Sequence, residues 1–191
     1  MNPTKARMLL AARDLLLHKG VEATAVEDIL KATKTGKSQF YHFFGSKAGM
    51  VNAVLASLNS ELIQGLWHDE TLPTITGWND VVPWLEAVSK QGKHGHPMAL
   101  LSLSIRPEER AAHPALGDFY GALRAPLLTF LETEQRDGRL LAQIKCTELA
   151  DLALTAVIGA TITQTIGFAD AEQTSRCAHH LYLYLKAYAR V

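Results

Sequence analysis

Two lysines near the start of the chain stand where helix physics alone does not place them. Lys37 lies in the first turn of an expected helix, and Lys47 follows Ser46, the expected N-cap of the next helix. A helix N-terminus carries partial positive charge and disfavours a cation by a few tenths to about 1 kcal/mol. A bound anion removes this conflict, because free N-terminal amides together with a lysine hold a phosphate well. The two lysines therefore predict phosphate clamps on either side of a groove-reading helix.

The helix between these lysines, from about residue 36 to residue 43, has an aromatic side and a polar side. At 100° per residue, Phe40, Phe43 and Phe44 share one side, which we expect to pack against the protein. The other residues of the helix form its polar side: Ser38, Gln39, Tyr41 and His42. Because a glutamine amide is chemically suited to adenine, this polar side is able to meet base edges.

A preceding helix and a turn must position this polar side. Thr24 and Glu27 have the spacing of a capping box, in which the hydroxyl accepts from the Glu27 amide and the carboxylate reaches the Thr24 amide. This spacing predicts a helix that begins at Thr24. Apolar residues at helical spacing give that helix an inner face, and the cluster at 33–36 ends it in a turn. The segment 24–47 is therefore predicted to be a helix-turn-helix.

These positions define the contacts that we expect with double-stranded operator DNA. The residues expected to hold phosphates are Thr24, Lys37, Tyr41, His42 and Lys47. The residues expected to meet base edges are Thr35, Lys37, Ser38, Gln39 and Tyr41.

Thr24 together with the run of residues 36–47 resembles the N-terminal domain of tetracycline-repressor (TetR) family transcriptional regulators. The resemblance covers about the first quarter of the chain. Family members usually carry an Ala-Gly-Val-Ser-like turn where this chain has Thr33-Lys34-Thr35-Gly36, so base-level specificity is not transferable. The resemblance implies a homodimeric repressor with a pocket for a small-molecule effector in the rest of the chain.

Charge is distributed unevenly along the 191 residues. The net charge of zero would by itself argue against a nucleic-acid partner. However, residues 1–50 contain 8 lysines and arginines against 4 acidic residues, whereas residues 51–191 contain 11 against 15. The basic end therefore carries the motif. A hydrophobic content of 48% excludes a disordered chain and fits one or two compact domains.

The periodicity predicts an all-α fold with about nine helices and no strand. Residues 1–46 are expected to form a three-helix DNA-binding domain, and residues 47–191 a helical bundle for ligand binding and dimerisation. The helices expected outside the motif span about 3–19, 47–67, 80–92, 98–105, 114–136, 147–167 and 171–189. The fourth helix, starting at residue 47, is expected to join the two domains.

The apolar run from Leu149 to Phe168 has the length of a membrane span. It contains Asp151 and several threonines, so a buried or dimer-forming helix explains it better. The small residues that would allow two helices to approach closely are Ala153, Ala156, Ala160, Thr163 and Gly167. We therefore expect a homodimer built by the last two helices. Because no charged-then-apolar leader follows Met1, we expect a cytoplasmic protein without a membrane partner.

Other kinds of site are less well supported by the residues. Gly36-Lys37-Ser38 could end a phosphate-binding loop, but that motif needs a glycine where this chain has Lys31. The loop histidines His94, His96 and His113 lack cysteines or carboxylates at ligand spacing, so we expect no metal.

The two cysteines invite a redox hypothesis. Cys146 begins a helix beside Lys145, where a thiolate would be favoured, and Cys177 lies mid-helix. In an antiparallel hairpin of the last two helices they would lie about 20 Å apart, at 1.5 Å per residue, so we expect reduced thiols.

A ligand cavity is expected between residues 67 and 168. The side chains named for it are Trp84, Met98, Leu101, Phe119, Leu123 and Ile158. Few charged residues accompany them, which predicts a largely apolar effector. No nucleophile, base and orienting group can be assembled, so we expect no enzyme and no cofactor. Two alternatives stay open: a helical-bundle enzyme with an accessory DNA-binding module, and a constitutive DNA binder without ligand.

Overall fold

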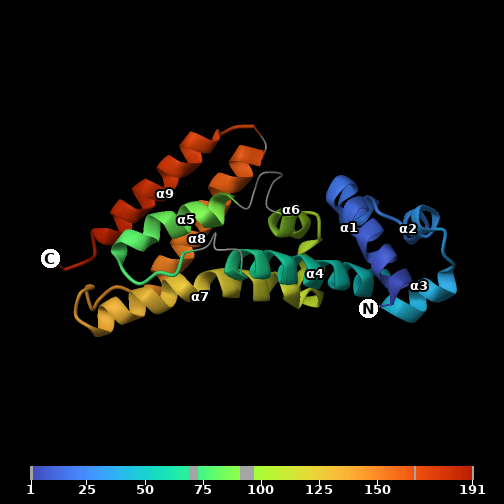
Figure 1. Cartoon of the computed structure of the whole chain (residues 1–191), viewed down its shortest axis with the longest axis horizontal. Coiled ribbons are helices and arrows are strands. Elements are labelled where there is room, and N and C mark those ends of the chain that lie inside the picture. Colours follow the sequence, from blue (N-terminus) through green and yellow to red (C-terminus); the bar gives the residue numbers. More distant parts are fainter. Residues whose placement is uncertain (1, 69–72, 91–96, 166, 191) are drawn as a thin grey trace. The chain divides into compact units, whose positions relative to one another are not determined.

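The structure is a computed structural model that describes residues 2–68, 73–90, 97–165 and 167–190. Nine α-helices and one 3-10 helix account for most of these described residues (Figure 1). The α-helices are α1 (Pro3–Ala23), α2 (Val26–Thr33), α3 (Lys37–Phe44), α4 (Lys47–His68), α5 (Trp78–Lys90), α6 (Pro97–Leu103), α7 (Pro114–Arg136), α8 (Cys146–Thr165) and α9 (Ala171–Lys186), and the 3-10 helix is η1 (Pro107–Ala112). The all-α prediction is confirmed.

The chain divides into two compact units, which are described separately. The first unit contains Met1–Glu61 and Pro97–Asp118, and the second contains Leu62–His96 and Phe119–Val191. The first unit therefore holds the helix-turn-helix together with most of α4, α6 and η1. This division extends the N-terminal unit beyond the boundary that we expect at residues 46 and 47.

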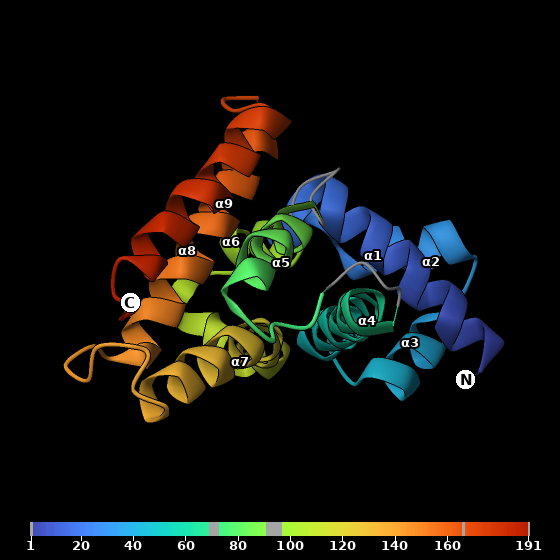
Figure 2. The same ribbon diagram turned by 60° about the vertical axis from the view of Figure 1, so that its left-hand side comes forward.

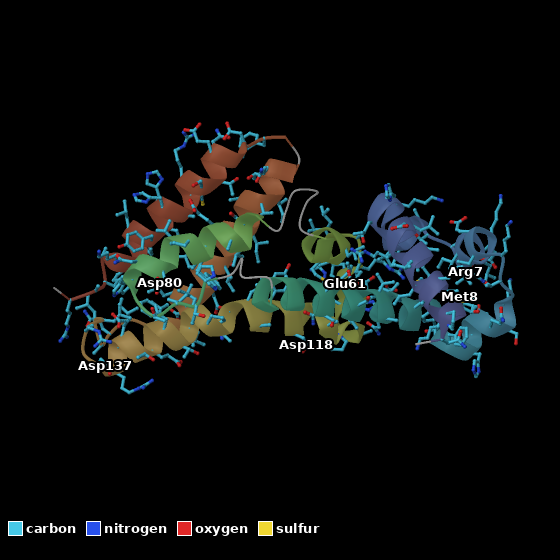
Figure 3. All side chains as sticks on the ribbon, in the orientation of Figure 1. Arg7, Met8, Glu61, Asp80, Asp118 and Asp137 are labelled. Atoms are coloured by element: carbon cyan, nitrogen blue, oxygen red, sulfur yellow. The ribbon has the colours of Figure 1, made fainter. Side chains whose placement is uncertain are left out.

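The core of the first unit forms because α1 and α2 each bury one face. α1 packs against α2 and α6, and Met8, labelled on α1 in Figure 3, is fully buried. Ala12 and Leu16 follow Met8 at a spacing of four residues and are also buried. Gly20 interrupts α1 with φ 80°, a conformation that glycine adopts without steric cost.

Thr24 corrects one prediction about the motif. Its side chain is fully buried, and its hydroxyl donates to the Gly20 carbonyl at 2.8 Å. α2 begins at Val26 instead, where the Asp28 carboxylate accepts from the Ala25 amide at 3.3 Å. The predicted capping box of Thr24 and Glu27 is therefore wrong. The physical reason is that the carbonyls at the end of α1 need donors, and the Thr24 hydroxyl supplies one.

The second unit is built on an antiparallel pair of helices, α8 and α9, with α5 packed against both (Figures 1 and 2). The turn between α8 and α9 ends at Asp170, whose carboxylate accepts from the Gln173 amide at 2.7 Å. The segment Cys146–Gln164 of α8 is long and apolar enough to cross a membrane by length and composition alone. In this structure one side of it packs against α5 and α9, and 39% of the apolar segment is buried.

Both cysteines are free thiols in the structure. Cys146 is buried, and burial, followed by the charge of Glu132, raises the pKa of its thiol. The expectation that the start of α8 favours a thiolate there is therefore wrong. Loss of hydration on burial is the main cause of the raised pKa.

Lys34 has the one positive φ among the described non-glycine residues, with φ 51° and ψ 46°. It ends α2, and its amide donates to carbonyls of the last helical turn. Glycine adopts this left-handed conformation at no steric cost. For other L-residues the conformation costs about 1 to 2 kcal/mol of free energy.

We expect Lys34→Gly to raise the free energy of unfolding by about 1 kcal/mol. Lys31→Gly is the matched control, because Lys31 is an exposed residue inside α2. That control should lower the free energy of unfolding by about 1 kcal/mol. Urea unfolding of both variants checks the pair, and a loss of stability in Lys34→Gly would contradict the strain at this turn.

Candidate nucleic-acid interface

Helix α3 presents one polar side to solvent and buries the other. Phe40 is 0% exposed and Phe44 is buried, with their ring centroids 5.3 Å apart. The Phe40 ring also meets the Tyr41 ring edge to face at 5.4 Å. The exposed residues of the helix are Lys37, Ser38, Gln39, Tyr41 and His42. The rotation of α3 is thus set by its two buried phenylalanines, and its polar side is available to a partner.

The turn before α3 leaves the start of this helix open. Gly36 is the N-cap and has no side chain to bind the first amides of α3. The Thr35 hydroxyl lies 2.7 Å from the buried Thr33 hydroxyl, so Thr35 is half-buried. Uncapped amides at a helix start are a favourable place for an anion.

Lys37 has a protein partner that the sequence did not reveal. Its Nζ lies 2.8 Å from Glu27 Oε1, and both side chains are about two-thirds exposed, at 65% and 64%. The hydrogen bond with Glu27 raises the pKa of Lys37 and lowers the pKa of the Glu27 carboxyl. The Glu27 carboxylate therefore offsets the unfavourable placement of Lys37 at a helix N-terminus, a role that the sequence assigned to a bound anion alone. Water screens so exposed a pair, so Lys37 can exchange Glu27 for a phosphate.

Lys47 lies at the start of α4, as predicted from Ser46. The Ser46 hydroxyl oxygen accepts from the Gly49 amide at 3.0 Å, which confirms the N-cap. Lys47 Nζ donates to the Glu22 carbonyl at 3.4 Å, a long contact near the end of α1. A cavity of about 330 Å³ adjoins Lys47 and is lined also by Glu22 and Arg106.

The structure gathers most of the predicted DNA contacts on α3 and its two flanks, but not Thr24. Because the Thr24 side chain is fully buried and its hydroxyl is used by α1, its assignment as a phosphate contact is wrong. The remaining predicted residues lie in or next to α3: Thr35, Lys37, Ser38, Gln39, Tyr41, His42 and Lys47.

A separate cavity lies wholly within the second unit. Its volume is about 600 Å³, and it is lined by Trp84 of α5 and by Ala122, Pro126 and Phe130 of α7. Residues 73–76 form another part of its wall. Asp80, labelled at the start of α5 in Figure 3, holds this stretch by accepting from the Thr76 amide and hydroxyl at 2.9 and 2.6 Å.

This cavity differs from the one that we expect from the sequence. Trp84 lines it, whereas Phe119 and Leu123 are core residues that do not. Ile158 lines another, open groove of about 510 Å³ along α7 and α8. Met98 and Leu101 are buried in the first unit. The six residues therefore do not line one cavity: Trp84 lines this one and Ile158 lines the groove.

The histidines do not assemble a metal site in the described residues, where no cluster of three His, Cys, Asp or Glu is close enough. His94 and His96 lie outside the described residues. His113 is buried, and its Nδ1 donates to Asn52 Oδ1 at 2.6 Å. Burial lowers the pKa of His113, which favours the neutral imidazole.

Comparison with known proteins finds a similar N-terminal domain. Residues 8–54 match the family of bacterial regulatory proteins described as the tetR family. The match covers the helix-turn-helix and its neighbouring helices, so the similarity concerns this domain. An uncharacterized HTH-type transcriptional regulator of Lactococcus lactis subsp. lactis, encoded in the lacX 3′ region, is 30% identical over 108 residues. That match covers 53% of this chain and 55% of the relative, so it spans about half of the relative's length.

Solved structures, several of them described as TetR regulators, share the fold over nearly the whole chain. Salmonella enterica GusR is 21% identical, with a TM-score of 0.68 and coverage of 97% of this chain and 98% of that one. A TetR regulator of Chloroflexus aurantiacus J-10-FL is 18% identical, with a TM-score of 0.78 and coverage of 98% and 96%. A cysteine-substituted CifR complexed with 26-base-pair operator DNA is 20% identical, with a TM-score of 0.72 and coverage of 94% and 95%. At these identities the likeness concerns the fold.

Two features of the helix-turn-helix domain were not predicted from the sequence. The Lys37 partner Glu27 lies on the preceding helix, and its spacing of ten residues is not a helical contact. Lys34 is exposed at the turn, and the signal that could identify it is a lysine where the family turn usually has glycine.

We expect Glu27→Gln to increase the affinity for duplex DNA by about threefold, the scale of an exposed ion pair. The substitution removes a carboxylate that competes with phosphate for Lys37. Fluorescence anisotropy with a labelled duplex measures the change. Glu172→Gln on α9 is the matched control, because Glu172 is also exposed and paired, with Arg176. An equal gain in both variants would show an effect of net charge instead.

Proposed function

We propose that the protein is a DNA-binding transcriptional regulator of the TetR family that binds a two-fold-related operator as a homodimer. The observation that carries this proposal is the exposed polar side of α3, on a helix whose rotation is set by buried Phe40 and Phe44. A helix with this division fits the major groove, because it offers hydrogen-bonding groups outward without disturbing its own packing.

The proposed mode of binding separates phosphate contacts from base contacts. Lys37 and Lys47 at the starts of α3 and α4 meet phosphates, with Tyr41 and His42 beside them. Gln39 and Ser38 meet base edges, with Lys37, Tyr41 and half-buried Thr35 as further candidates. A protein of the same fold, CifR, has been solved in complex with operator DNA, which supports DNA binding by this fold.

Selection from a pool of random-sequence duplexes tests the proposal directly. The proposal expects an enriched sequence with two related halves, because a dimer with two-fold symmetry presents two copies of α3. An enriched sequence without such symmetry would contradict a homodimeric regulator.

We further propose that a small molecule controls this binding and that the protein acts as a cytoplasmic repressor. The 600 Å³ cavity of the second unit has the size of a small-molecule site. α4 is one continuous helix with residues in both units, so it can transmit a change from the second unit to the first. A ligand that prefers the form unable to bind DNA shifts the population off the operator.

Two alternative functions give different results in simple assays. A constitutive DNA binder would keep the same operator affinity with every compound that stabilises the protein. A helical-bundle enzyme with an accessory DNA-binding module would turn over a small molecule. We favour the regulated binder because a cavity is present and no acid, base and nucleophile converge in it.

We expect Lys47→Ala to weaken operator and non-specific DNA alike, because phosphates carry no sequence information. In a salt titration, the slope of log affinity against log salt should fall in magnitude by about one. Lys145→Ala is the control, since Lys145 is an exposed, paired lysine of the second unit. An unchanged slope in Lys47→Ala would remove Lys47 from the interface.

Gln39→Ala should change the base preference of the protein rather than the salt dependence of its DNA binding. It should relax the preference at one base position, with a discrimination loss of about 1 to 3 kcal/mol, and leave the salt slope unchanged. Competition among operators with single base changes measures this discrimination. Equal losses on every sequence would contradict base reading by Gln39.

We expect Ala160→Arg to yield monomers and to reduce operator binding strongly. Ala160 lies on the small-residue side of α8 and is half-buried. Exposed apolar residues lie elsewhere on α8 and α9: Leu152, Leu183 and Tyr184. An arginine there prevents close approach of a second copy. Sedimentation of this variant beside Ala142→Arg, at an exposed position after α7, decides the outcome. A dimeric Ala160→Arg would place the interface elsewhere.

A further inference from the structure

The turn between α2 and α3 holds a lysine in a backbone conformation that suits glycine better. Lys34 is the C-cap of α2, with φ 51° and ψ 46°. Two hydrogen bonds close the turn around it in the Schellman arrangement. The Thr35 amide donates to the Leu30 carbonyl at 3.1 Å, and the Lys34 amide donates to a carbonyl one turn back, that of Lys31, at 3.4 Å. The turn therefore needs a left-handed residue at position 34 but no side chain, because glycine would close it without strain.

The Lys34 side chain is exposed and has no polar partner within the protein. It forms no ion pair or side-chain hydrogen bond with any residue that the structure describes. Both carboxylates of α2 are engaged elsewhere, since Glu27 pairs with Lys37 at 2.8 Å and Asp28 pairs with Lys19 at 3.5 Å. A residue that keeps a strained backbone without serving the fold indicates a function outside the folded chain.

The backbone on both sides of Lys34 is held by the neighbouring threonines. Thr33 is buried, and its hydroxyl donates to the Ile29 carbonyl at 2.7 Å. The Thr35 hydroxyl lies 2.7 Å from the Thr33 hydroxyl. The turn lies at the edge of the first unit in both views and leads directly into α3 (Figures 1 and 2). The Lys34 side chain thus leaves a fixed backbone, and its flexible stem carries the ammonium.

We propose that the Lys34 ammonium binds a phosphate of the DNA backbone beside the groove that receives α3. This inference rests on the proposed DNA-binding function and adds a contact to it. Lys31, Lys34 and Lys37 recur every three residues across the turn, and all three are exposed. Among the described residues, only Lys37 of these three has an acidic partner. A lysine is a compact charge on a flexible stem, which suits a phosphate, whereas base edges are read best by bidentate groups.

The cations of the second unit are arranged differently. Several of its lysines and arginines have an acidic partner, as in the pairs Arg124–Asp151, Arg139–Glu134, Lys145–Glu148 and Arg176–Glu172. Such pairs cancel much of the local charge. Lysines without an acidic partner at the turn before α3 leave a positive potential there, which attracts a polyanion such as duplex DNA.

Substitutions at Lys34 separate its charge from its backbone conformation. Lys34→Gly removes the ammonium and relieves the strain, so this variant should resist urea better and yet bind DNA more weakly. Lys34→Asn also removes the ammonium, but asparagine tolerates the left-handed conformation, so its DNA binding should fall equally. Lys34→Arg keeps the charge and should bind DNA as the unaltered chain does.

Fluorescence anisotropy at several salt concentrations measures the binding of the full chain to two probes. One probe is a labelled mixed-sequence duplex, and the other is the duplex enriched by selection. In both neutral variants, the slope of log affinity against log salt should fall in magnitude by about one for each copy of the chain on the DNA. The two duplexes should lose affinity by the same factor, because a phosphate carries no sequence information.

Arg110→Asn is the matched control. Arg110 is an exposed cation of η1 in the same unit and, like Lys34, it forms no ion pair with the residues that the structure describes. This substitution removes the same charge from the unit without altering the turn, so the salt slope should stay unchanged. Urea unfolding establishes that each variant is folded.

The inference is overturned if both neutral variants keep the salt slope of the unaltered chain, or if Arg110→Asn lowers the slope as much as they do. It is also overturned if the loss is confined to one base position of the selected duplex, which would show a base contact instead. If the unaltered chain binds the selected duplex and the Lys34 variants bind it with the same slope, the DNA-binding function stands and this inference alone is wrong. If the unaltered chain binds neither duplex, the proposed function is wrong as well.

Discussion

The burial of Phe40 and Phe44 is the constraint on which the presentation of α3 depends. A helix of eight residues has too few hydrogen bonds to be stable alone, so tertiary packing must hold it. Because these two rings occupy the inner face, the residues between them are turned outward, including Tyr41 and His42. Exposure of a polar side is thus a direct result of where the aromatic residues are buried. The same packing also fixes the start of α3, where the first amides lack a capping side chain.

Lys37 and Lys47, at the starts of α3 and α4, are held by weak local contacts. Lys37 pairs with Glu27, and Lys47 makes a long hydrogen bond to the Glu22 carbonyl. Contacts of this kind are screened by water and contribute little to stability. These contacts restrict where each lysine amine lies without burying the amine. A phosphate can replace them, because a charged phosphate forms stronger hydrogen bonds with an ammonium group than neutral acceptors do. A site arranged in this way keeps its cations near the interface in the absence of DNA.

The two tryptophans of α5 differ in their hydrogen bonding. Trp78 donates its indole N–H to buried Glu134, whose other oxygen accepts from Arg139, so all three polar groups are satisfied. Trp84 contributes its ring to the same cavity but leaves its N–H unpaired. A buried donor without a partner destabilises a protein unless something else satisfies it.

The sequence by itself determined the all-α class, the order of the helices and the outward side of α3, because residues three and four apart share a helix face. Only the tertiary structure decided that Thr24 turns inward, that Glu27 meets Lys37, and that Trp84 rather than Phe119 lines the cavity. These outcomes depend on contacts between different helices. The spacing of residues along the chain does not determine how those helices are rotated relative to one another. Buried polar groups such as those of Thr24 and Glu134 are paired by whichever neighbours the packing brings near, and that choice belongs to the folded chain.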